Sequence, residues 1–258
     1  MDAFSSLGAI MGSQGELEHY ERIYYGYQVQ GRGAHTPEDL IAQFRTAISA
    51  YNEAIGPLLP SEKTVSCLDL GCGSGNWLYF LRQRGYANAR GVDMDPKQVE
   101  LARSLGLSAE VEDVTSALER SERLGLISAL DVIEHLDKNS AVRFLERIYA
   151  HLEPGGMLVL KCPCADGFCG VHDLCNDLTH RWAPSSNMLS QLLRAVGFEN
   201  GRVIDLSLPP YPTGARRKAL LCLRRVARWL TKTWLHLLGV APGPVWSSSL
   251  MAVAWKPV

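Results

Sequence analysis

Residues 67–77 read Cys-Leu-Asp-Leu-Gly-Cys-Gly-Ser-Gly-Asn-Trp, and this stretch decides the fold. An apolar run ends, Gly71, Gly73 and Gly75 follow at alternate positions, and a helical pattern begins. Glycines at such a turn let the backbone bend tightly and let a ligand approach without meeting a Cβ atom. The spacing is G-x-G-x-G rather than the G-x-G-x-x-G of dinucleotide-binding turns, and Asp69 precedes it. We therefore predict a strand, a glycine loop and a helix that together bind a cationic ligand rather than a pyrophosphate.

Short apolar runs and helical patterns alternate on both sides of this stretch. The predicted strands are 65–70, 89–92, 126–130 and 157–160, and the predicted helices between them are 77–84, 96–105 and 140–152. Alternation of this kind predicts a parallel sheet with helices on both faces. A helix at 185–196, ended by Gly197, and strands at 202–206 and 250–255 complete the pattern.

Two further acidic positions follow the glycine loop in order. Asp93 ends the second predicted strand, where a carboxylate can accept hydrogen bonds from both hydroxyls of a ribose, and Met94 beside it can cover an adenine ring. Asp113 follows a short third strand, where it can accept from an adenine amino group while the Val114 amide donates to a ring nitrogen. The alternatives are that Asp69 caps a turn, that Asp93 caps the next helix and that Asp113 is a loop acid.

Taken in order, these segments resemble the class I S-adenosylmethionine-dependent methyltransferases. The matching motifs are LDLGCGSG at 68–75, GVDMDP at 91–96, the acid at 113, LDVIEHL at 130–136 and HLEPGGMLVLKCP at 151–163. The resemblance covers about half of the chain, from residue 65 to about 197. It implies an α/β, Rossmann-like, seven-stranded and mostly parallel sheet whose last strand is antiparallel. S-adenosylmethionine would bind at the carboxyl ends of the first strands, against Leu130 as well as the residues above.

The catalytic candidates follow the fourth predicted strand. If Asp131, Glu134 and His135 begin a helical turn, they fall at i, i+3 and i+4 on one face. His135 can then serve as a general base near neutral pH. Alternatively, the three residues bind a divalent metal ion that orients an acceptor hydroxyl and lowers its pKa. A third possibility is that Glu134 and His135 only brace the turn.

A second cluster follows the fifth predicted strand. The segment 177–182, Asp-Leu-Thr-His-Arg-Trp, resembles the methyltransferases of bacterial surface-polysaccharide and lipopolysaccharide gene clusters, and it makes His180 a further catalytic candidate. The same loop is rich in cysteine. A zinc site would draw on Cys162, Cys164, Cys169, Cys175 and His172. Their spacings differ from those of common zinc sites, so we favour buried thiols.

The chain has 258 residues and divides into two predicted parts. Residues 1–60 form a helical cover, with Thr36 as the N-cap of a helix from Glu38 to Ile55, and residues 61–258 form one methyltransferase domain. No apolar run is long enough to span a membrane, and no signal peptide is recognisable. Seven cysteines without a secretion signal favour reduced thiols and a cytoplasmic protein.

A basic insertion is predicted at 207–246, before the last strand. No Asp or Glu follows Asp205, whereas eight basic residues do, although the net charge of the chain is only −1. A helix at 214–238 gathers its apolar side chains on one side and its basic side chains on the other. The apolar set is Leu220, Leu223, Val226, Ala227, Leu230, Trp234, Leu237 and Leu238, and the basic set is Arg217, Lys218, Arg224, Arg225, Arg228, Lys232 and His236.

Two uses of this helix remain open. It can pack its apolar side onto its own domain or onto another subunit, or it can lie on a membrane with its basic residues against anionic lipid. We favour the membrane, at the inner face of the cytoplasmic membrane. Nucleic acid is disfavoured, because it has no need of the apolar side.

The predicted reaction is O-methylation of a sugar hydroxyl on a nucleotide-linked or lipid-linked glycan. The alternatives are methylation of a lipophilic small molecule, such as a quinone precursor or another phenol, and methylation of a terminal 2′-hydroxyl of RNA. A non-enzymatic scaffold that keeps the cofactor fold is the remaining alternative, and the intact glycine and acid motifs argue against it.

Overall fold

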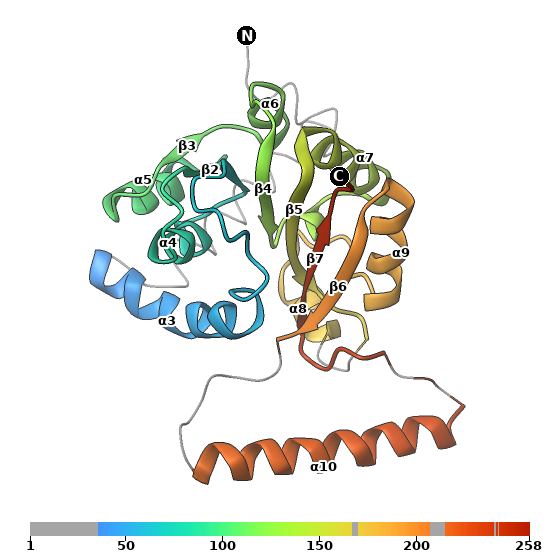
Figure 1. The fold of residues 1–258 in the computed structure, drawn as a ribbon. Helices are drawn as coiled ribbons and strands as arrows, with labels where there is room; N and C mark the ends of the chain where they lie inside the picture. The colour runs from blue at the N-terminus through green and yellow to red at the C-terminus, as the bar shows by residue number, and fades with distance from the viewer. Residues whose placement is uncertain (1–35, 167–169, 207–214, 240, 242) are drawn as a thin grey trace.

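The computed structural model describes residues 36–258 except 167–169, 207–214, 240 and 242 (Figure 1). Its core is a seven-stranded sheet of order β3-β2-β1-β4-β5-β7-β6. The strands are β1 Cys67–Leu70, β2 Ala89–Asp93, β3 Ala109–Val111, β4 Leu124–Leu130, β5 Leu152–Pro163, β6 Glu199–Asp205 and β7 Ser249–Trp255. The strands from β3 to β5 pair in parallel, whereas β7 pairs antiparallel with both β5 and β6. The predicted fold class is confirmed.

Helices cover both faces of this sheet. They are α3 Pro37–Ala54, α4 Asn76–Gln83, α5 Pro96–Ser104, α6 Val114–Glu119, α7 Lys138–His151, α8 Gly170–Asn176, α9 Ser186–Val196 and α10 Ala215–Leu237, with a 3-10 helix, η1, at Ile133–His135. Alternate side chains of β1 and β4 enter opposite cores, as the period of a strand requires. Leu68 and Ile127 pack with the residues of α7 and α9, whereas Cys67 and Leu126 pack with those of α3 and α4.

The turn from β1 to α4 depends on its glycines. Gly71, Gly73 and Gly75 all have positive φ angles, of 73°, 52° and 89°, which side chains with a Cβ atom rarely adopt. At Gly71 a Cβ atom would also lie 2.6 Å from a methyl group of Val132. The backbone therefore turns at the carboxyl edge of the sheet with no side chain between the loop and the space beside it.

The N-terminal part of the described chain is a single helix, α3. Thr36 caps it as predicted, since its side chain accepts a hydrogen bond from the Asp39 amide. Tyr51 of α3 meets the aromatic rings of Trp77 and Phe80 on α4, with centroids 5.0 and 5.6 Å apart. These contacts fix α3 across the carboxyl edge of the sheet. The rest of the predicted cover, residues 1–35, lies outside the described residues.

Three local elements differ from the predictions. Helix α6 begins at Val114, where a ligand-binding loop was predicted, and α8 was not predicted at all. The turn after β4 is a 3-10 helix, and Asp131 stands outside it with a φ of 57°. Asp131, Glu134 and His135 therefore do not share one face of an α-helical turn. A non-glycine residue in the left-handed region sends its side chain a different way from those that follow it.

Helix α10 lies across the end of the molecule where the parallel strands finish (Figure 1). β6 runs parallel to β5, so it ends at this edge, and β7 runs antiparallel, so it begins there. An insertion between them must leave and re-enter the sheet at the carboxyl edge. No helix among the described residues combines the length and the apolar character needed to cross a bilayer.

Candidate active site

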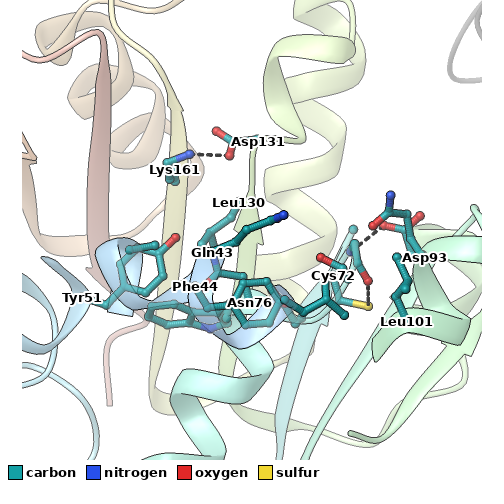
Figure 2. Close-up of a pocket in the computed structure, with 18 of the residues that line it drawn as sticks. Gln43, Phe44, Tyr51, Cys72, Asn76, Asp93, Leu101, Leu130, Asp131 and Lys161 are labelled. Carbon is teal, nitrogen blue, oxygen red and sulfur yellow. Dashed lines mark hydrogen bonds and ion pairs between the residues drawn. The ribbon is translucent and has the colours of Figure 1, made fainter. Parts of the chain in front are cut away.

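A cleft of about 740 Å³ lies at the carboxyl edge of the sheet, beneath α3. Its walls come from the ends of β1, β2, β4 and β5, from the glycine loop and from α3 (Figure 2). Such a volume falls within the range of small-molecule sites. Of the residues predicted to bind the cofactor, the cleft is lined by Asp69, Gly71, Gly73, Asp93 and Leu130.

Asp69 supplies a buried carboxylate to the cleft. Only 2% of its surface is exposed, and its Oδ1 accepts a hydrogen bond of 2.6 Å from the Ser128 hydroxyl. Burial raises the pKa of Asp69 to about 7, which the bond from Ser128 opposes. A buried acid of this kind is stabilised in its ionised form by a cationic ligand. The predicted preference for a cation thus has a chemical basis in the structure.

Asp93 joins the glycine loop to the end of β2. Its Oδ2 accepts from the Gly73 amide at 2.8 Å and its Oδ1 from the Asp95 amide at 2.9 Å. Each carboxylate oxygen can accept a further bond, so both remain able to receive ribose hydroxyls. The helix cap that Asp93 might have formed is made by Asp95, whose side chain accepts from the Lys97 amide.

Gly75, Met94, Asp113 and Val114 do not line the cleft. The Asp113 carboxylate instead caps α6, accepting from the Thr115 amide at 2.8 Å and from the Ser116 hydroxyl. Val114 is the first residue of that helix. Asp113 is therefore the N-cap of α6, a common role for an aspartate at the start of a helix.

Two cleft residues, Lys161 and Tyr51, were not predicted. The Lys161 ammonium pairs with the Asp131 carboxylate at the end of β5 (Figure 2). Burial alone would lower the pKa of Lys161, but Asp131 and Tyr51 beside it raise that pKa above its ordinary value. Burial raises the pKa of Tyr51 to about 12, so its hydroxyl stays protonated. The cleft therefore holds an ion pair and a phenol beside Leu130.

Glu134, His135 and His180 form a second cluster. It lies next to Asp131 and outside the residues that line the cleft. One ligand atom from each residue lies within 4.8 Å of the others. Both carboxylate oxygens of Glu134 are buried and have no hydrogen-bond partner in the part of the chain that the structure describes. Burial and the nearby Asp131 raise the pKa of Glu134 well above its usual value. The predicted metal trio of Asp131, Glu134 and His135 is therefore not assembled, because Lys161 holds Asp131 in the cleft and His180 takes its place.

The segment 177–182 docks directly onto η1. The Arg181 amide donates to the Glu134 carbonyl at 2.9 Å, and the Trp182 indole donates to the Leu136 carbonyl at 2.8 Å. The rings of His135 and His180 lie 4.9 Å apart. Two motifs that are 45 positions apart in the chain thus form one cluster.

This docking also fixes the form of His135. The Thr179 hydroxyl donates to Asp177 at 2.6 Å, so it must accept from His135 Nδ1, which lies 2.9 Å away. Burial, and then His180, lower the pKa of His135 to about 4, so the ring is neutral at pH 7. With the proton on Nδ1, the lone pair is on Nε2, as in metal-binding histidines whose other nitrogen donates to a neighbour.

Comparison with known proteins decides the family. Residues 35–203 match a family model described as a methyltransferase domain. This chain belongs to that methyltransferase family. Its fold is similar to that of an S-adenosylmethionine-dependent methyltransferase from Archaeoglobus fulgidus, with a TM-score of 0.59, 18% identity and coverage of 93% of this chain and 99% of the other.

Curated relatives of the methyltransferase act on diverse acceptors. It is 30% identical over 139 residues to ajmaline N-methyltransferase of Rauvolfia serpentina, covering 50% of this chain and 48% of the relative. It is 29% identical over 153 residues to a probable chloroplastic tocopherol O-methyltransferase of Oryza sativa subsp. japonica, covering 56% of this chain and 41% of the relative. The methyltransferase thus matches less than half the length of these two relatives, and their acceptors are not transferable to it.

The cysteines of the methyltransferase do not form a cluster within the described residues. Cys162 and Cys164 are buried, and burial raises the pKa of both thiols, whereas Cys175 is exposed. Cys169 lies outside the described residues. Glu134, His135 and His180 are the one metal-compatible group found in the described part of the chain.

We expect the affinity for S-adenosylmethionine to rise with pH around neutrality. Asp69 is protonated in the free enzyme below a pH of about 7 and ionised above it, and the cationic ligand favours the ionised form. Calorimetry should therefore show binding about 10-fold tighter at pH 8 than at pH 6. Asp69→Asn keeps an acceptor for Ser128 but cannot ionise, so it should flatten this dependence. A flat profile in the wild type would separate Asp69 from the cationic group.

Asp93→Ala should weaken S-adenosylmethionine binding by about 1.5–3 kcal/mol, the range for a hydrogen bond to a charged group. The matched control is Asp95→Ala, because Asp95 is buried two residues away and does not line the cleft. Losing the α5 cap should cost about 1 kcal/mol of folding stability and leave the affinity nearly unchanged. Equal affinity losses in both variants would mean that Asp93 acts only through the shape of the loop.

Proposed function

We propose that this methyltransferase O-methylates a sugar hydroxyl on a nucleotide-linked or lipid-linked glycan. The observation that carries the proposal is the docking of segment 177–182 onto η1. This segment resembles the methyltransferases of bacterial surface-polysaccharide clusters, and it completes a polar cluster behind Asp131. A hydroxyl acceptor needs such polar groups, because it must be oriented and must lose its proton.

The residues of the cleft suit a hydroxyl acceptor. Bound S-adenosylmethionine supplies a methyl group activated by its sulfonium. Asp69, Gly73 and Asp93 bind the donor, and Leu130 and Asp131 lie at the next strand end, toward Lys161. The Asp131 carboxylate, which pairs with the Lys161 ammonium, can accept a hydrogen bond from the acceptor hydroxyl. This pair holds the acceptor, and the Asp131 carboxylate can accept the hydroxyl proton as the acceptor oxygen takes the methyl group from the sulfonium.

We further propose that Glu134, His135 and His180 bind a divalent metal ion. A fully buried carboxylate without a hydrogen-bond partner among the described residues is costly unless a cation or a proton neutralises it. Two imidazoles and one carboxylate are the ligand types that Zn²⁺, Fe²⁺ and Mn²⁺ accept. Such an ion would orient an acceptor oxygen and lower its pKa. The Thr179–Asp177 pair would then orient His135 as its ligand.

The acceptor is tested with S-adenosylmethionine labelled in its methyl group. The enzyme is incubated separately with nucleotide sugars, with lipid-linked glycans extracted from bacterial membranes, with quinone-precursor phenols and with RNA. We expect label in a sugar fraction, released by acid hydrolysis as an O-methylated monosaccharide. Label confined to the phenols or to RNA would contradict the glycan assignment and leave the methyltransferase assignment in place.

A lipophilic small molecule is the second candidate. Leu40, Phe44 and Tyr51 of α3 give the cleft an apolar wall, and one relative is named as a tocopherol O-methyltransferase. The phenol arm of the labelling experiment tests this candidate directly. For either acceptor, we propose that the enzyme works in the cytoplasm, at the inner face of the membrane.

A further inference from the structure

Helix α10 has an apolar side that is not buried by the rest of the described chain. Leu223, Leu230 and Trp234 are 66%, 54% and 53% exposed. The half-buried Leu221, Arg228 and Leu235 form a different stripe of the helix. The remaining exposed apolar side chains of the helix and its end are Val226, Trp229, Leu237 and Leu238. An exposed patch of this extent on one helix indicates a partner surface.

Asp205 anchors this arrangement. Arg228 of α10 pairs with Asp205 Oδ2 at 2.9 Å, and the amide and hydroxyl of Ser247 donate to Asp205 Oδ1. Asp205, the last acidic residue of the sequence, therefore connects the middle of α10 to the segments on either side of the insertion. With Arg228 drawn toward the sheet, the apolar side of the helix is left facing outward.

The charge of the helix selects the kind of partner. α10 carries seven Lys and Arg residues and no Asp or Glu. Arg225 and Lys232 are exposed, the exposed Trp229 lies one helical turn from each of them, and the exposed Trp234 belongs to the apolar side. Basic residues that flank an apolar face with Trp and Leu characterise helices that lie in the plane of an anionic membrane. At about 1.5 Å per residue, the 23 residues form a rod of roughly 35 Å along that plane.

The place of the insertion connects this surface to the cleft. Leu206, the last described residue before the insertion, lines the cleft, and α10 lies at the same carboxyl edge of the sheet (Figure 1). We propose that α10 docks the enzyme on an anionic lipid surface, with the cleft on the membrane side. If the proposed O-methylation is correct, the acceptor is therefore the lipid-linked form of the glycan. That last step rests on the proposed function, whereas the docking does not.

Vesicle flotation tests the docking with the full chain. Vesicles of phosphatidylcholine with phosphatidylglycerol should float the protein, vesicles of phosphatidylcholine alone should float little of it, and 0.5 M salt should release it. Failure to float with phosphatidylglycerol at low salt would overturn the proposal. Equal flotation with both kinds of vesicle would overturn the role of anionic lipid.

Two sets of variants identify the surface. Leu223→Ser, Leu230→Ser and Trp234→Ser together should weaken vesicle binding by at least ~10-fold, since an in-plane helix binds through its buried apolar area. Arg225→Gln with Lys232→Gln should weaken it by about 5-fold for each charge removed. The matched control, Val258→Ser, removes an exposed apolar side chain outside α10 and should float as the wild type does.

The same samples test whether a second copy of the protein covers the apolar side instead. They also test whether the variants still bind S-adenosylmethionine. A wild type that sediments as a dimer while the triple serine variant sediments as a monomer would assign the apolar side to a second copy and overturn the proposal. All variants should bind S-adenosylmethionine as the wild type does. Flotation without methylation of lipid-linked glycan would contradict the proposed acceptor alone, and methylation of soluble acceptors without flotation would contradict the docking alone.

Discussion

His135→Ala should lower turnover by ~10²-fold or more while leaving the affinity for S-adenosylmethionine nearly unchanged. His135 is buried outside the cleft proposed to bind the donor, so its loss should not alter donor contacts. As a ligand or a base, its neutral imidazole serves the acceptor side of the reaction. Steady-state kinetics together with calorimetry on the same variant separates the two effects.

Two comparisons distinguish a ligand from a base. If His135 holds a metal ion, chelation should abolish activity and a divalent ion should restore it. Glu134→Gln should then lower turnover as His135→Ala does. If it is a base with a pKa of about 4, activity should instead fall only as the pH drops through that value. His151→Ala is the control, because His151 is the last residue of α7 and its Nδ1 bonds to the Arg147 carbonyl of the same helix. Wild-type turnover in His135→Ala would assign the residue to bracing the turn.

Gly73→Val should reduce S-adenosylmethionine binding at least 100-fold, which corresponds to about 2.7 kcal/mol. The nearest atom to a Cβ at this position is Gln98 Oε1, at 3.9 Å, so a side chain would enter the open cleft rather than the protein. A branched side chain would occupy the path of the ligand. Calorimetry and thermal unfolding of the same variant measure the two consequences, lost binding and backbone strain.

Gly85→Val separates those consequences. Gly85 has a φ of 88° and its nearest neighbour to a Cβ atom is Lys63, also at 3.9 Å, but it does not line the cleft. Both variants place a β-branched residue in the left-handed region, at a cost of about 1–3 kcal/mol. Only Gly73→Val should lose the ligand. Retained affinity there would show that the glycine loop is not a wall of the donor site.

The sheet could be predicted because its central strands are buried on both faces and therefore appear as continuous apolar runs. The glycine loop could be predicted because positive φ angles restrict the residue type. Asp113 shows the limit of such reasoning. A carboxylate after a strand can bind a ligand or cap a helix, and the six residues of α6 are too few for a clear helical period.

The unpredicted part of the site depends on contacts between distant segments. The β4–β5 register pairs Leu130 with Lys161, which is what brings the ammonium to Asp131. Periodicity along a single strand carries no information about register with its neighbour. Likewise, His180 reaches His135 only because segment 177–182 folds back on η1. Each motif was recognisable, but the partner of each was set by tertiary packing.

The position of the insertion between β6 and β7 determines which changes in its sequence affect the cleft. Asp205 and Leu250, the residues on either side of it, are paired neighbours across β6 and β7. The chain therefore leaves and re-enters the sheet at neighbouring positions of these two strands. α10 itself, between Ala215 and Leu237, supplies none of the described residues that line the cleft, so its length and its side chains can change without removing a cleft wall. The outer surface of this edge can therefore diverge in sequence while the walls of the cleft stay the same.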